Sequence, residues 1–136
     1  MRKASGILLV LLALVGVWVG LSIAQMSPEE VQQLSLIHSL SVGQGAPTVF
    51  PDVVTVRVNK PVRLYNISAD KPGEIHDPVV ISSDELGKNP VFGVRGFKVE
   101  PGKVTVVEFT PTQTGTFFIT HLQHAHPIVA KLIVKD

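Results

Sequence analysis

Most of the chain after Val49 consists of short runs rich in β-branched residues, separated by turn residues such as Asn59-Lys60-Pro61 and Pro101-Gly102-Lys103. The runs cover residues 53–58, 62–67, 79–82, 97–100, 104–109, 116–120 and 130–134, with a long connection over 83–96. Regularly spaced short strands with turn signals between them are typical of sandwiches and barrels. The pattern predicts an all-β, antiparallel Greek-key sandwich or barrel of about seven to eight strands.

The segment before this domain has a different pattern. Ser27-Pro28-Glu29-Glu30 has the composition of a helix start, with Ser27 as N-cap and Glu30 completing a capping box. The spacing of Val31, Leu34 and His38 predicts a short helix from Val31 to about Leu40. Gly and Pro residues over 43–47 then interrupt the chain. We therefore expect an N-terminal helical segment and linker over 25–47 and a single domain over 48–136.

The first 24 residues resemble a targeting segment. Arg2 and Lys3 precede an apolar run from Gly6 to Ala24, and Ser22-Ile23-Ala24 supplies small residues suited to cleavage. The run also approaches the ~20 apolar residues that cross a bilayer. Residues 1–24 are therefore predicted to be a signal peptide or an N-terminal membrane anchor. Either reading places the folded part outside the cytoplasm, in the periplasm or another extracytoplasmic compartment.

Charge and composition narrow the function. Without Arg2 and Lys3, ten basic residues stand against eleven acidic ones, so the exported part lacks the basic surface that nucleic-acid binding needs. The chain contains no cysteine and therefore no disulfide. No phosphate-binding glycine loop and no Ser-His-Asp order occurs, which argues against most enzyme classes.

Three of the five histidines occur within six residues, in His121-Leu122-Gln123-His124-Ala125-His126. Strand alternation places His121 on the same inward face as Phe117 and Ile119. His76 precedes another predicted strand, and loop and strand-end residues of this kind can meet at one end of a sandwich. Neutral imidazole is a common transition-metal ligand, so the pattern predicts a metal site.

The stretch from Gly115 to His124, continuing into Ala130-Lys131-Leu132-Ile133-Val134, resembles the copper loop of the cupredoxins, the family of plastocyanin and azurin. His76-Asp77, followed by Val79-Val80, is similar to the upstream ligand region of that family. The resemblance covers about residues 49–136. It implies a cupredoxin-like sandwich and a copper cofactor.

Carried over to this chain, the resemblance implies His76 and His124 as histidine ligands. His121 stands where the family has its cysteine ligand, and Ile128 falls near the axial methionine. Because blue copper sites depend on thiolate coordination, a site lacking it is expected to be a non-blue, type 2 copper centre. The predicted metal ligands are His76, His121, His124 and His126, with Asp77 orienting His76 from outside the coordination sphere.

The predicted function is copper handling, meaning sequestration, delivery or tolerance, with a copper-receiving oxidase or a redox protein as partner. Electron transfer at an atypical site, a zinc site with hydrolase or hydratase activity, and a metal-free relative with a polar loop remain alternatives. His38 is interpreted as a residue on the helix face. Asn66-Ile67-Ser68 formally matches a glycosylation acceptor but lies in a predicted strand.

Overall fold

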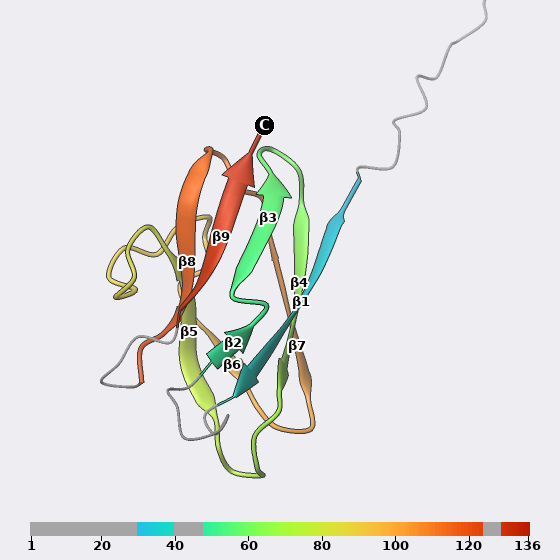
Figure 1. Cartoon of the computed structure of the whole chain (residues 1–136), viewed down its shortest axis with the longest axis vertical. Helices are drawn as coiled ribbons and strands as arrows, with labels where there is room; N and C mark the ends of the chain where they lie inside the picture. Colours follow the sequence, from blue (N-terminus) through green and yellow to red (C-terminus); the bar gives the residue numbers. More distant parts are fainter. Residues whose placement is uncertain (1–29, 40–47, 124–128) are drawn as a thin grey trace, which may run out of the picture.

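The computed structural model describes residues 30–39, 48–123 and 129–136, and these ranges form nine strands and no helix (Figure 1). The strands are β1 (Gln32–Ser39), β2 (Thr48–Phe50), β3 (Val53–Arg57), β4 (Val62–Ser68), β5 (His76–Ser82), β6 (Phe97–Val99), β7 (Val104–Phe109), β8 (Gly115–His121) and β9 (Val129–Lys135). Every strand predicted after Val49 is present. Accordingly, none of the described residues belongs to a helix that would be long and apolar enough to cross a bilayer.

The strands form two sheets with the orders β2-β1-β4-β7 and β3-β9-β8-β5-β6. Five of the pairings are antiparallel, as predicted. The pairings of β1 with β4 and of β3 with β9 are parallel, which differs from the prediction. Parallel neighbours require a crossover connection. The chain supplies one between β1 and β4 by passing through β3, which belongs to the other sheet.

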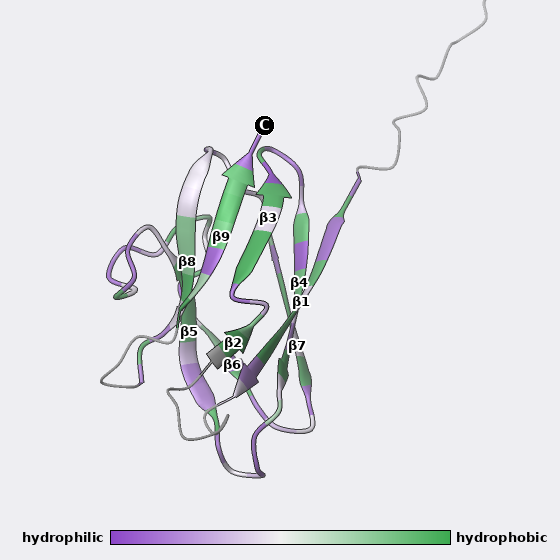
Figure 2. Ribbon diagram, viewed as in Figure 1, coloured by the Kyte–Doolittle hydropathy of each residue, from purple (hydrophilic) through white to green (hydrophobic). Residues whose placement is uncertain are grey.

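The core lies between the sheets and is built by strand alternation. In β9, alternate residues are buried, and β3 has the same two-residue period. The largest fully buried apolar side chains come from both sheets: Leu36, Leu64, Ile81, Ile119 and Leu132. Figure 2 shows the apolar colour along much of β3 and β9. Full burial of each such side chain stabilises the fold by about 1.5–3 kcal/mol.

Residues 32–39 form strand β1 instead of the predicted helix, so that part of the sequence prediction is wrong. Leu34, Leu36 and His38 face inward, while Ser35 and Ile37 are exposed. The inward and exposed residues of this segment therefore alternate with a two-residue period, although its apolar residues also fit the spacing of a helix. Pairing with β4, from Gln32 opposite Val62 to His38 opposite Ser68, decides between the two patterns because it satisfies the backbone groups. The capping residues 27–29 lie outside the described residues.

Candidate metal centre

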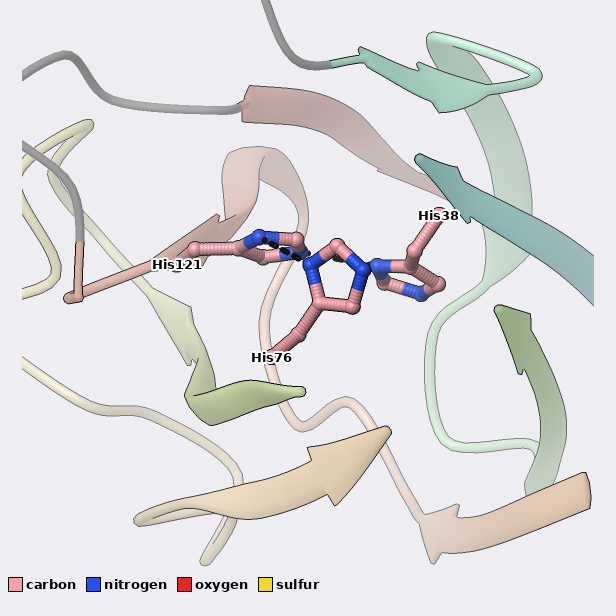
Figure 3. A group of neighbouring side chains, drawn as sticks. All are labelled: His38, His76 and His121. Carbon is pink, nitrogen blue, oxygen red and sulfur yellow. Dashed lines mark hydrogen bonds between the residues drawn. The ribbon is translucent and has the colours of Figure 1, made fainter. Parts of the chain in front are cut away.

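Three histidines from three strands meet between the two sheets (Figure 3). His38 lies near the end of β1, His76 begins β5, and His121 ends β8. Strands β5 and β8 are neighbours in one sheet, whereas β1 belongs to the other. The three side chains are almost fully buried, with exposed fractions of 0%, 0% and 2%. The cluster therefore joins the two sheets at a point that water scarcely reaches.

The imidazole rings contact one another through nitrogen atoms. Nδ1 of His38 lies 2.8 Å from Nε2 of His121, and Nδ1 of His76 lies 3.0 Å from Nδ1 of His121. One ring nitrogen from each residue can be chosen so that all three lie within 4.8 Å of one another. The three rings thus bring nitrogen atoms that could bind a metal into one region.

Asn66 on β4 sets the proton position on His38. The Asn66 Nδ2 group donates to the backbone carbonyls of Leu64 and Thr105, at 3.2 Å each, which fixes the orientation of the amide. Its Oδ1 atom consequently faces Nε2 of His38 at 3.0 Å. Since an amide oxygen only accepts, Nε2 of His38 carries the proton. The Nδ1 lone pair of neutral His38 is left facing His121.

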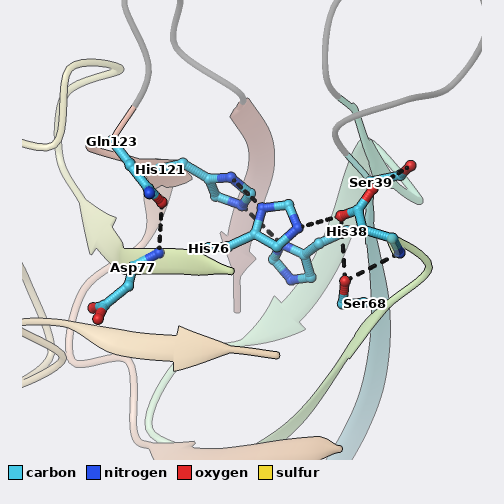
Figure 4. A network of polar contacts seen from close by, with 8 residues as sticks. His38, Ser39, Ser68, His76, Asp77, His121 and Gln123 are labelled. Carbon is cyan, nitrogen blue, oxygen red and sulfur yellow. Dashed lines mark hydrogen bonds and ion pairs between the residues drawn. The ribbon is translucent and has the colours of Figure 1, made fainter. Parts of the chain in front are cut away.

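Asp70 has the same role at His76, which Figure 4 shows in a polar network with Ser39 and Ser68. Its Oδ2 atom lies 2.6 Å from Nε2 of His76, and both side chains are 0% exposed. The hydroxyl of Ser39 donates to Oδ1 of Asp70, and that of Ser68 donates to Oδ2. A carboxylate surrounded by donors holds the His76 proton on Nε2. The Nδ1 atom of His76 is then the nitrogen that faces His121.

Burial keeps His38 in its neutral form. The pKa of His38 falls from 6.5 to about 4, chiefly because burial removes hydration. The nearby His76 also lowers this pKa, whereas the hydrogen bond to Asn66 and the charge of Asp70 raise it. His38 is therefore neutral near pH 7, which is the state that a metal requires of imidazole.

This donor set fits a transition-metal ion. His121 contacts Nδ1 of His38 through its Nε2 atom and Nδ1 of His76 through its Nδ1 atom, so one ion can use only one of these two His121 nitrogens together with the Nδ1 atoms of the other rings. Ligands 2.0–2.1 Å from a tetrahedral ion lie about 3.3 Å apart, whereas one nitrogen from each ring can be chosen so that all three lie within 4.8 Å of one another, so the rings must move closer together to bind one ion. Imidazole nitrogens suit copper, zinc and nickel.

The structure brings together only some of the predicted site residues. His76 and His121 come together as the sequence analysis expected, whereas His124 and His126 lie outside the described residues. Asp77 is exposed, and its backbone N–H donates to Oε1 of Gln123 at 3.1 Å. The carboxylate on the outer nitrogen of His76 is therefore Asp70 and not Asp77.

Sequence reasoning missed the contribution of His38 and the polar face of β4. His38 continues the inward alternation of Leu34 and Leu36, a signal that the helix interpretation concealed. Asn66 and Ser68 likewise continue the inward face begun by Val62 and Leu64. Two polar residues on an otherwise apolar inward face are an identifiable signal, because buried polar groups require partners.

The two-sheet architecture is the cupredoxin fold. No protein-family model matches the sequence, and no curated protein sequence matches it. Solved structures do match, and their identities to this chain are low enough that the likeness establishes the fold alone.

Three of these structures illustrate the likeness. Dithionite-reduced auracyanin from Roseiflexus castenholzii has a TM-score of 0.58 and 12% identity, and the match covers 77% of this chain and 98% of that one. A copper-binding protein solved in its apo form has a TM-score of 0.51 and 22% identity, covering 77% and 88%. Copper nitrite reductase from Nitrosomonas europaea has a TM-score of 0.55 and 17% identity, covering 78% and 42%.

Proposed function

We propose that this protein binds copper through His38, His76 and His121 and serves in copper handling outside the cytoplasm. The observation that carries the proposal is the convergence of three buried imidazoles whose outer nitrogens on His38 and His76 are occupied by Asn66 and Asp70. Outer partners of this kind orient metal-bound histidines in many proteins. The Nδ1 atoms of His38 and His76 would hold the ion, together with one ring nitrogen of His121.

The choice of copper rests on ligand chemistry and on the fold. Copper leads the affinity order of the divalent first-row ions at nitrogen sites, and the similar solved structures include copper proteins. The chain has no cysteine to supply a thiolate. A bound copper ion would therefore have nitrogen ligands and weak colour, as in a type 2 centre. His124 and His126 are further candidate ligands, because they follow His121 closely in the chain.

The same chemistry favours copper handling over electron transfer. Rapid electron exchange in blue copper proteins depends on the copper–thiolate bond, and a three-histidine site rearranges more between Cu(I) and Cu(II). Sequestration of copper or its delivery to an oxidase requires no such speed. The predicted signal peptide or anchor over 1–24 supports a periplasmic location, where the partner would be a copper-receiving oxidase or another redox protein.

The test is a competitive titration of the protein with copper and zinc, followed by electron paramagnetic resonance of the Cu(II) form. The parent is expected to bind one copper ion more tightly than zinc and to give a nitrogen-rich, non-blue signal. Separate alanine substitutions of His38, His76 and His121 should each weaken binding and change the spectrum.

The control is Asn89→Ala, which removes a polar side chain that hydrogen-bonds to Asp84 in the loop after β5 and, among the residues that the structure describes, to no histidine. Separate His124→Ala and His126→Ala variants test whether these two candidate ligands contribute. Unchanged copper binding in all three cluster variants would refute the site. A preference for zinc would refute copper as the metal, and rapid electron self-exchange would favour the electron-transfer alternative over copper handling.

A further inference from the structure

Asp70 is a fully buried carboxylate that directly contacts the histidine cluster. It follows β4 by two residues and extends the series Asn66, Ser68 and Asp70 at every second position. We propose that Asp70 is the positioning residue and the counter-charge of the metal site, so that it favours Cu(II) over Cu(I) there. This inference rests on the proposed copper function.

The positioning role follows from the hydrogen bonds of Asp70. Its Oδ2 atom lies 2.6 Å from Nε2 of His76, while the hydroxyls of Ser39 and Ser68 donate to its two oxygens at 3.1 and 3.2 Å. These donors hold the carboxylate in place, and it can only accept from His76. The His76 proton is therefore kept on Nε2, and Nδ1 is kept free for the ion.

The counter-charge role follows from burial. Asp70 hydrogen-bonds to the cluster through His76, and its side chain is 0% exposed. A nearby negative charge stabilises a divalent ion about twice as strongly as a monovalent one, because the Coulomb energy is proportional to the charge. The effect is largest where water does not screen it. Asp70 therefore lowers the reduction potential of bound copper.

The partner of His38 provides an internal comparison. Asn66 fixes the His38 proton through an amide oxygen at 3.0 Å and carries no charge. An amide is thus sufficient to orient an imidazole in this fold. The carboxylate at the equivalent position on His76 adds charge to the same geometric function, so a substitution of Asp70 by asparagine separates the two roles.

The first experiment uses the metal-free protein and ¹⁵N NMR of the histidine rings, recorded above the ordinary histidine pKa of about 6.5. In the parent and in Asp70→Asn, His76 is expected to carry its proton on Nε2, because both side chains offer an oxygen acceptor. In Asp70→Ala, that preference is expected to disappear. An unchanged His76 tautomer in Asp70→Ala would overturn the positioning role.

The second experiment measures Cu(I) and Cu(II) affinities by competition with chelators, and the reduction potential of the loaded protein. In Asp70→Asn, Cu(II) affinity is expected to fall at least tenfold more than Cu(I) affinity, which raises the potential by about 59 mV or more. A potential equal to that of the parent would overturn the counter-charge role. If Asp70→Ala fails to fold, Asp70→Asn still tests this role. The shorter Asp70→Ser side chain then replaces Asp70→Ala in the tautomer measurement, with the same expected loss of the Nε2 preference, and an unchanged tautomer would overturn the positioning role.

Asp84→Asn is the matched control. Asp84 also accepts from a serine hydroxyl, that of Ser82, and from backbone N–H groups in its loop, but its hydrogen bonds involve no histidine. This variant should leave both the tautomer and the potential unchanged. A parent that binds no copper would refute the proposed function and the counter-charge role together. The tautomer measurement would then decide the positioning role alone.

Discussion

Acid is expected to destabilise the metal-free protein through His38. The pKa of this side chain is about 4 in the folded chain and 6.5 in the unfolded chain, chiefly because burial removes hydration. Between these values the unfolded state binds more protons, so stability falls as the pH falls. The contribution of neutral His38 to the free energy of unfolding is therefore fully present above about pH 6.5 and is lost as the pH falls toward 4. The shift of about 2.5 units corresponds to about 3 kcal/mol, with about 2 kcal/mol lost by about pH 5.

The measurement is urea unfolding of the metal-free protein at several pH values between about 7 and 4, compared with His38→Gln. Glutamine does not titrate, so the variant should lose less stability over this range, although it starts from a lower value. The difference between the two pH profiles isolates His38 from the other groups. Parallel profiles for the parent and the variant would refute the argument that burial holds His38 neutral. A loss of about 3 kcal/mol is large beside typical domain stabilities of 5–15 kcal/mol.

Two further predictions concern single residues. Gly87 and Gly102 both have positive φ, at 70° and 77°, but an added Cβ at Gly87 would collide with the side chains of Leu122 and Val80, whereas Gly102 has open space. In thermal or urea unfolding, Gly102→Ala is expected to lower the free energy of unfolding by about 1–2 kcal/mol, and Gly87→Ala by about 1–3 kcal/mol more. Equal losses in the two variants would show that the added Cβ at Gly87 does not collide with its neighbours. Asn66 is 0% exposed and hydrogen-bonded to His38, so it should stay unglycosylated when secreted by a glycosylating host, and a glycan in the intact mass would show that this burial is wrong.

The strands after Val49 could be predicted because local signals and tertiary structure agree there. The turn at Pro101-Gly102-Lys103 separates β6 from β7 in the structure, as its composition indicated. The interpretation failed at residues 32–39, where the same apolar residues fit both a helical and a two-residue period. That choice depends on the hydrogen-bonding partner β4, which follows more than twenty residues later in the chain and is not visible in a local pattern.

The candidate site could be predicted only in part for a similar reason. The inward orientation of His121 follows from alternation with Phe117 and Ile119, and all three residues are buried in the structure. Asp70 could not be identified, because its contact with His76 depends on the loop that connects β4 to β5. Asp77 was the plausible choice from chain proximity alone. Its exposed position follows from strand alternation, since β5 begins one residue earlier, at buried His76.

The parallel register of β1 and β4 has a consequence for how such a site arises or disappears in evolution. Ile37 and His38 are consecutive residues that lie on opposite faces of β1. A shift of one residue in β1 exchanges the two faces of the strand. With the preceding chain held in place, a single codon inserted at the start of this strand would thus put Ile37 at the inward position of His38, and a single deleted codon would put Ser39 there. The sandwich would then acquire or abandon its third histidine without any substitution in the histidine codon itself.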